Sequence, residues 1–315
     1  MKRPLRHFAR IALALLVALV LALLAAEGAL RIWTPQRLAF ETNEHRRDPD
    51  VALLTVDPEL GFVPVLGGER FAPHGAQWND YALEKPPGRV RLLFIGDSVT
   101  ERGAIVNGLR AELGDERYEY WNAGVGGYAT RQELGYYRRY CGDIRPDQVI
   151  LTFHMNDFDA SPVYFQDEGV VAVRASNVRR PDPWLWQYSI AYRLWFQWTV
   201  DKVEPPSLEE RLRDLEGALA ELRDLVHERG AELTVLVFPW LRPLAKWPGA
   251  LPRKHELVLE LLAKLGIPHH AFLDELEAAL AEGVEVREKE RDPQHPSPEF
   301  GRRIAHALVA RGFAP

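Results

Sequence analysis

The chain has 315 residues, of which 47% are hydrophobic, and a formal net charge of -6 at neutral pH. This composition supports a sizeable buried core and excludes an intrinsically disordered protein. Four basic residues lie among the first ten, so the remainder is more acidic than the whole chain, which disfavours nucleic acid as a partner. The single cysteine, Cys141, excludes an intrachain disulfide and a lipid-modified N-terminal cysteine, and we expect it to be a small buried apolar residue.

The N-terminal segment has the pattern of a membrane anchor. Residues 11–26 form an uninterrupted apolar run behind the basic cluster, and the helical pattern continues to Trp33, a residue suited to the membrane interface. Residues 1–33 are therefore predicted to be a cytoplasmic basic stub and a transmembrane signal-anchor, with the rest periplasmic or on the cell surface. A cleaved signal peptide is the alternative, although Glu27 stands where a small-residue cleavage site is expected.

Residues 34–87 are irregular, with a charged tether at 41–50 followed by frequent Pro and Gly. We interpret them as a linker and an extended segment lying on the main domain. The sequence "EKPPGR" then marks the start of a domain that spans residues 88–315.

Within that domain, apolar runs of strand length alternate with segments of helical periodicity. The predicted strands are "VRLLFIG", "YEYWNAG", "QVILTFH", "AELTVLVFPW" and "IPHHAFLD", and the longest helix runs from Ser207 to about Arg229. Parallel strands need crossover connections, which are usually helical. The alternation therefore predicts an α/β fold, with a parallel sheet covered by helices on both faces.

An aromatic-rich insertion is predicted at about 158–203, where "PWLWQYSIAYRLWFQWTV" gathers seven aromatic side chains. The plain interpretation is a helical subdomain that buries these rings. A lid over the site and a surface at the membrane interface are the two functional alternatives.

Polar side chains follow the first three strands at their carboxyl ends, where an open parallel sheet binds its ligands. Ser98 follows the first strand, a glycine-rich turn at 124–127 follows the second, and Asn156 and Asp157 follow the third. These segments are expected to face one crevice.

Late in the chain, "RDPQHPSPEFG" places Asp292 and His295 before a final helix, whose start is marked by Ser297 as N-cap and Pro298 as first helical residue. A serine hydroxyl is a weak nucleophile, and a neutral imidazole is the usual base that activates it. His295 is therefore the candidate base for Ser98, and Asp292 the group that orients its ring.

Hydrogen-bond donors for an oxyanion are also present. Gly127 can offer its backbone N–H without steric hindrance, and Asn156 can donate from its amide, beside the backbone of Ser98 itself. The candidate pocket is completed by Asp97, His154 and Asp157.

At these residues the chain resembles the SGNH hydrolase family, the GDSL-type esterases and lipases. The resemblance covers about residues 88–315 and rests on "GDSV", the glycine after the second strand, "HMND" and "DPQHPS". It implies a flavodoxin-like three-layer α/β/α sandwich and esterase activity, with marker residues Ser98, Gly127 (Gly124 being the second choice), Asn156 and His295. The anchor and linker resemble membrane-tethered bacterial members. The chain departs from the family motifs at two positions, where Val99 replaces Leu and His154 replaces Gly. We expect His154 to be a histidine at the end of a strand whose ring is hydrogen-bonded to the backbone.

Other motifs are weaker. "GVGGYA" fits a dinucleotide fingerprint but lies after the second strand, the histidines lack metal-ligand spacing, and the G-x-S-x-G elbow is absent. No cofactor or metal is expected. The sequence thus predicts a serine ester hydrolase whose substrate is an acyl ester, a short acyl group on a cell-envelope carbohydrate or lipid. An O-acyltransferase with the same triad and a non-catalytic carbohydrate-binding protein are the alternatives.

Overall fold

The computed structural model describes residues 3–33, 54–57, 59–158, 163–167, 170–174, 182–200 and 206–313. The chain divides into two compact units, the first formed by Met1–Ala52 and Val163–Pro205 and the second by Leu53–Pro162 and Pro206–Pro315. The predicted tether at 41–50 and the side chain of Trp186 lie outside the described residues.

The second unit is built on a five-stranded parallel sheet. Its strand order is β4-β3-β5-β8-β9, with every neighbouring pair parallel. The five predicted strands are confirmed, and their bounds are β3 Val90–Gly96, β4 Tyr118–Asn122, β5 Gln148–Phe153, β8 Glu232–Val237 and β9 His269–Ala271. This is the doubly wound order of a flavodoxin-like fold, in which ligands bind where the strand order reverses, here at the carboxyl ends of β3 and β5.

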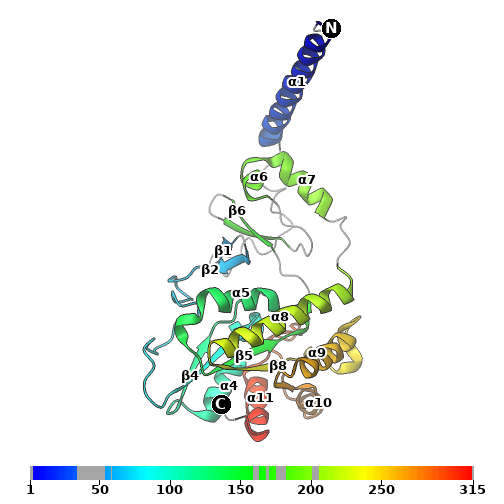
Figure 1. Cartoon of the computed structure of the whole chain (residues 1–315). Coiled ribbons are helices and arrows are strands. Elements are labelled where there is room, and N and C mark those ends of the chain that lie inside the picture. Colours follow the sequence, from blue (N-terminus) through cyan, green and yellow to red (C-terminus); the bar gives the residue numbers. More distant parts are fainter. Residues whose placement is uncertain are drawn as a thin grey trace. The chain divides into compact units, whose positions relative to one another are not determined.

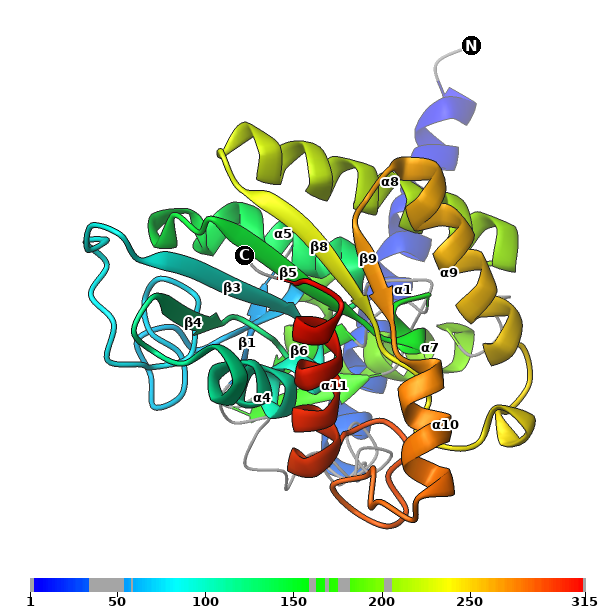
Figure 2. The same cartoon turned by 90° about the horizontal axis from the view of Figure 1, so that it is seen from below.

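Helices cover both faces of this sheet, which makes the unit a three-layer α/β/α sandwich (Figures 1 and 2). The helices α4 (Ala104–Leu113), α10 (Leu273–Ala281) and α11 (Pro298–Ala310) share one core cluster. On the other face α5 (Thr130–Tyr140) packs against α8 (Leu208–Glu228), and α9 (Leu251–Leu265) connects β8 to β9. The short helices are α3 Ser98–Glu101, η3 Gly142–Ile144, η4 Met155–Phe158 and η5 Leu244–Lys246.

The helix predicted from Ser207 to about Arg229 is confirmed, and its start has a physical cause. The Ser207 hydroxyl accepts from the N–H of Glu210 (3.2 Å), and the Glu210 carboxylate accepts in return from the N–H of Ser207 (2.8 Å). This reciprocal capping satisfies two N–H groups that the first turn leaves free. Leu215, Leu219 and Leu222 then form its buried face.

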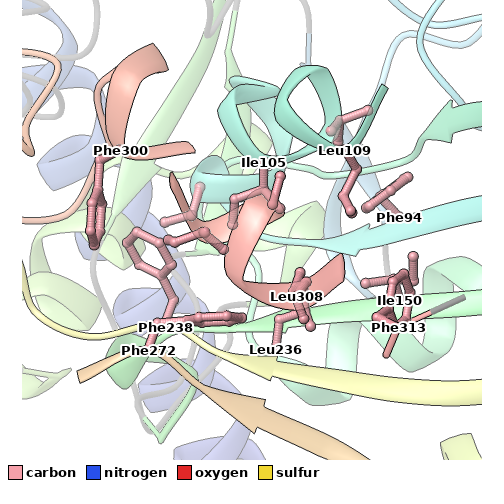
Figure 3. Packing of buried hydrophobic residues seen from close by; sticks show 14 of the residues in the cluster. Phe94, Ile105, Leu109, Ile150, Leu236, Phe238, Phe272, Phe300, Leu308 and Phe313 are labelled. Carbon is pink, nitrogen blue, oxygen red and sulfur yellow. The ribbon is translucent and has the colours of Figure 1, made fainter. Parts of the chain in front are cut away.

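A hydrophobic core lies between β3, β5, β8 and the helices α4, α10 and α11 (Figure 3). It contains fully buried rings from distant parts of the chain, each of which contributes about 1.5–3 kcal/mol by leaving water. They include Phe94, Phe238, Phe272 and Phe300. Helix α11 approaches α4 so closely that a Cβ on Gly108 would lie 2.6 Å from the carbonyl oxygen of Gly301. This contact holds the loop before α11 near the end of β3.

From residue 54 onward, the predicted linker contributes a hairpin to the second unit. Strands β1 (Leu54–Asp57) and β2 (Gly61–Pro64) are antiparallel, and Tyr128 donates from its hydroxyl to the carbonyl of Phe62 (2.7 Å). A fully buried Arg91 pairs with Glu119 (2.7 Å) and donates to the carbonyls of Ala82 and Leu83. These bonds satisfy a guanidinium that would otherwise be costly to bury, and they hold the segment before β3 against the sheet.

The first unit contains α1 (Arg3–Trp33), the antiparallel strands β6 (Val163–Asp167) and β7 (Val170–Arg174), and the helices α6 (Pro183–Tyr188) and α7 (Ile190–Val200). Within α1, the segment Arg10–Ile32 is long and apolar enough to cross a membrane by length and composition.

The insertion predicted at about 158–203 is helical only in its second part, which contains α6 and α7. Its first part is a hairpin, which the β-branched and aromatic residues around Glu168-Gly169 could have indicated.

Candidate active site

Ser98 lies beyond the carboxyl end of strand β3, as the first residue of α3. The turn requires glycine at position 96, where φ is +150° and a Cβ would collide with the Thr100 side chain and lie 3.0 Å from the carbonyl oxygen of Thr152. Asp97 is the N-cap, and its Oδ1 accepts from the N–H of Val99 (2.8 Å). The aspartate caps the helix, and the serine next to it is left half-buried at the sheet edge.

His295 and Asp292 lie beside this serine. The Nε2 atom of His295 is 2.8 Å from the Ser98 Oγ, and its Nδ1 atom is 2.6 Å from Asp292 Oδ2. The loop that carries them is held by backbone bonds from Glu288 N–H to the carbonyl of His295 (2.9 Å) and from Ser297 N–H to that of Val286 (3.0 Å). The predicted cap of the last helix is confirmed, because the Ser297 hydroxyl accepts from the N–H of Phe300 (3.1 Å).

The charge on Asp292 determines where the proton of the imidazole resides. Partial burial raises the pKa of this carboxyl, but hydrogen bonds from the Gln294 N–H and from His295 outweigh burial, and the pKa is lowered overall. The carboxylate is therefore ionised at neutral pH and accepts a hydrogen from Nδ1 of His295. Nε2 is then the acceptor, and the Ser98 hydroxyl donates to it.

Asn156 is connected to the nucleophile turn through Asp97. Its Nδ2 donates to Asp97 Oδ2 (2.9 Å), while its Oδ1 is 2.6 Å from the Nδ1 atom of His154. Because an amide oxygen only accepts, His154 must donate from Nδ1. This bond fixes the orientation of the Asn156 amide, whose NH₂ group is directed to the side of Asp97.

His154 is fully buried and stacks on Trp240, with ring centroids 5.8 Å apart and an interplanar angle of 23°. Burial lowers its pKa despite the nearby Asp97, so the ring is neutral at neutral pH. Our expectation that backbone satisfies this side chain is wrong, because its partner is the Asn156 amide. Asp157 instead accepts from the N–H of His154 (2.9 Å) and so shapes the turn after β5.

The glycine turn after β4 also reaches the nucleophile. A Cβ on Gly126 would lie 3.6 Å from the Cβ of Ser98, and the next residue, Gly127, has a φ of +80°. Gly124, the second choice for the oxyanion glycine, packs elsewhere, since a Cβ there would lie 2.5 Å from the backbone nitrogen of Glu101. The turn thus brings Gly126 beside the nucleophile, whereas Gly124 packs against the backbone of Glu101.

Two buried titratable groups lie outside the hydrogen-bonded chain of Ser98, His295 and Asp292. Glu133 on α5 is 2% exposed, and burial followed by the charge of Asp97 raises its pKa well above the ordinary range. Its surroundings in sequence, "RQEL", resemble a solvated helix face and do not indicate burial. Cys141 is fully buried as expected, and burial raises the pKa of its thiol to about 12, which makes it a poor nucleophile.

Of the predicted site residues, the structure brings Ser98, His295 and Asp292 into one hydrogen-bonded chain. A second chain runs from Asp97 through Asn156 to His154. Sequence reasoning missed Trp240, although it is the last residue of the fourth predicted strand, at the edge where an open parallel sheet binds its ligands. Within the described ranges, no group of three His, Cys, Asp or Glu side chains is arranged to hold a metal ion.

Comparison with known proteins shows distant structural likenesses. No family model and no curated protein matches the chain. Solved structures that resemble it include LAE5, an alpha/beta hydrolase enzyme from the metagenome of Lake Arreo (16% identity, 71% of this chain and 95% of that chain, TM-score 0.47). Others are a mutant of Axe2, an acetylxylan esterase from Geobacillus stearothermophilus (16%, 71% and 95%, 0.47), and the acetyl xylan esterase AlAXEase (12%, 70% and 99%, 0.45). At this distance they do not identify a family, and the function has to be argued from the site itself.

Proposed function

We propose that this protein is a serine ester hydrolase of the SGNH type, with Ser98 as nucleophile, His295 as general base and Asp292 as the residue that orients the base. The observation that carries the proposal is the chain of two short contacts, 2.6 Å from Asp292 to His295 and 2.8 Å from His295 to Ser98. If His295 and Asp292 were only structural, they would not need to form a hydrogen-bonded chain that ends on a partly exposed hydroxyl at the ligand-binding edge of the sheet.

In the first half of the reaction, the Ser98 Oγ attacks the carbonyl carbon of the ester, and its proton passes to Nε2 of His295. The resulting imidazolium is stabilised by the ionised carboxylate of Asp292. The tetrahedral intermediate then collapses, the C–O bond to the alcohol breaks, and the leaving oxygen takes the proton from Nε2. The products of this step are a free alcohol and an acyl-enzyme on Ser98.

In the second half, a water molecule takes the place of the alcohol. His295 accepts a proton from the water as its oxygen attacks the acyl carbon, and returns this proton to Ser98 Oγ as the acyl-serine bond breaks. The carboxylic acid leaves, and the site returns to its starting protonation state. No cofactor is required by this sequence of steps.

The negative charge on the carbonyl oxygen needs donors that are already in place. We assign them to the backbone N–H of Ser98, the backbone N–H of Gly127 and one hydrogen of the Asn156 amide. Ser98 is the first residue of α3, where backbone N–H groups have no partner within the helix. The amide of Asn156 has two hydrogens, of which Asp97 accepts one, and the hydrogen bond from His154 prevents the amide from turning its oxygen toward the oxyanion.

The substrate we infer is an acyl ester with a short acyl group, carried by a carbohydrate or lipid of the cell envelope. This follows from the resemblance of the motifs and from the predicted membrane anchor. Water and a sugar hydroxyl are alternative acceptors for the same acyl-enzyme, so the assay has to measure both products.

The test is turnover of 4-nitrophenyl acetate and of an acetylated oligosaccharide by the full chain and by Ser98→Ala and His295→Ala. Both substitutions should abolish release of acetate. Thr199→Ala, which also removes a hydroxyl but lies in the first unit, is the matched control and should retain activity. Full activity in Ser98→Ala would overturn the proposal, and transfer to an added sugar in preference to water would identify a transferase.

A further inference from the structure

In the first unit, the only acidic residue of the apolar segment Arg10–Ile32 has a defined set of partners. The carboxylate of Glu27 accepts from the backbone N–H groups of Ile190 (2.8 Å) and Ala191 (3.1 Å) and from the Ser189 hydroxyl (3.0 Å). Ile190 is the first residue of α7, so a side chain from α1 caps a helix that lies more than 160 residues later.

A second contact completes this junction. Arg31, one turn after Glu27, donates to the carbonyl of Tyr188 at the end of α6 (2.8 Å) and to Glu27 itself (3.1 Å). The negative group thus meets the start of α7, and the positive group meets the end of α6. Both charges have the sign that the backbone dipoles at those helix ends favour. Figure 1 shows α6 and α7 at the end of α1.

Because Glu27 contacts the start of α7, its position along α1 determines how deep α7 lies relative to a membrane. Residues 10–26 are all exposed, and partial burial begins only at Glu27. A helix rises 1.5 Å per residue, so Glu27 is about 26 Å from Arg10 along the axis, against a hydrocarbon thickness of about 30 Å. If Arg10 lies at one boundary, Glu27 lies just inside the other, where a carboxylate needs hydrogen-bond donors.

The exposed side chains of α6 and α7 suit that layer. Trp184, Tyr188, Trp195 and Trp198 are 66%, 52%, 43% and 64% exposed, whereas Phe196 on the opposite side of α7 is fully buried. Trp195 and Trp198 are three residues apart and so share a helix face. Large exposed aromatic residues are unfavourable in water, but tryptophan and tyrosine concentrate at the boundary between lipid headgroups and acyl chains.

We propose that α1 stays attached to the mature protein and that the aromatic face of α6 and α7 lies in the lipid headgroup layer on the extracytoplasmic side of the membrane. This face is formed by Trp184, Tyr188, Trp195 and Trp198. Glu27 and Arg31 are the positioning residues that hold this face at the depth of the anchor's end. The partner is the lipid bilayer itself. The proposal does not depend on the reaction at Ser98, because all its contacts lie in the first unit.

The experiment uses the full chain in vesicles of phosphatidylethanolamine and phosphatidylglycerol. A nitroxide spin label is attached to Trp198→Cys or, as a second site, Trp184→Cys; the native Cys141 is fully buried. Labels at Leu16→Cys and Leu24→Cys on α1 provide depth references, and exposed Glu116→Cys in the second unit provides a water reference. Collision with oxygen and with a water-soluble nickel chelate is measured at each position, together with the mass of the intact protein.

The expected ratio of oxygen to nickel collisions at Trp198 and Trp184 lies severalfold above that of Glu116 and below that of Leu24. Adding Glu27→Ala to either label should shift the ratio toward the water reference. Three results would overturn the proposal: ratios equal to that of Glu116, low collision with both reagents as beneath a protein lid, or a mass that shows removal of α1. A ratio unaffected by Glu27→Ala would refute the role of Glu27. Monodisperse elution and an unchanged near-ultraviolet circular dichroism spectrum check that each variant is folded.

Discussion

Replacing Asn156 by alanine separates a catalytic donor from a structural contact. In the structure its amide nitrogen donates to Asp97 (2.9 Å) and its oxygen pairs with Nδ1 of His154 (2.6 Å). The first bond leaves one amide hydrogen for the substrate oxyanion, and the second fixes which way the amide faces. Alanine removes both bonds and the proposed oxyanion donor, but neither atom of the Ser98-His295 contact.

The expected loss is large because the donor acts on the transition state. Removing one preorganised oxyanion donor lowers kcat by about 10²–10³-fold, which corresponds to about 2.7–4 kcal/mol. The ester carbonyl of the bound substrate carries little of that charge, so KM should change much less than kcat. Stability should also fall by about 1–3 kcal/mol, since the buried Nδ1–H of His154 loses its acceptor.

The assay is steady-state hydrolysis of 4-nitrophenyl acetate by the full chain in dodecyl maltoside, with urea unfolding of the same samples. Asn107→Ala makes the same substitution at an exposed position of α4 and should leave kcat unchanged. A kcat for Asn156→Ala within about threefold of the wild type, less than about 0.7 kcal/mol, would refute the assignment of Asn156 to the oxyanion hole. A rise in KM with kcat unchanged would refute it equally.

Three further results are expected. Asp292→Asn should lower kcat by about 10³–10⁴-fold through loss of the orienting carboxylate, and near-wild-type turnover would contradict its role. Turnover should rise from acidic to neutral pH, because a general base accepts the proton of Ser98 only in its unprotonated form, so a flat profile would contradict a histidine base. Because burial and Asp97 raise the pKa of folded Glu133, its contribution to stability is present below its unfolded pKa and is lost as pH rises toward the folded value. The stability of Glu133→Gln relative to the wild type should therefore increase with pH, by up to about 1.4 kcal/mol per pH unit. Urea unfolding of both proteins between about pH 5 and about pH 8 measures this difference, and a difference that does not change with pH would contradict the prediction.

The sheet and its order of elements could be predicted because each strand is a local pattern. Five apolar runs of strand length, separated by helical periodicity, identify a parallel sheet, and the residues that follow them must meet at one edge. Ser98 and Asn156 were predicted in this way to face one crevice, with no knowledge of distances, whereas His295 was predicted from the loop before the final helix. The cap at Ser297 is likewise a local signal, and it is confirmed.

What could not be predicted depends on contacts between distant segments. The stacking of His154 on Trp240 depends on how β5 and β8 end side by side. The pairing of His154 with Asn156 is local, but it depends on the conformation of the turn after β5. A strand-end histidine in sequence does not reveal its partner. Glu27 is a similar case, because in sequence it interrupts an apolar run, while its partners, Ser189 and the first two residues of α7, lie 162 to 164 residues away.

The most direct measurement of the central claim is covalent labelling with a fluorophosphonate, which reacts with a serine only when a base activates its hydroxyl. The account predicts a single adduct in the intact mass, located on the peptide that contains Ser98, with no adduct in Ser98→Ala and strongly slowed labelling in His295→Ala. Labelling of Ser98→Ala at the wild-type rate, or an inert wild type, would contradict it.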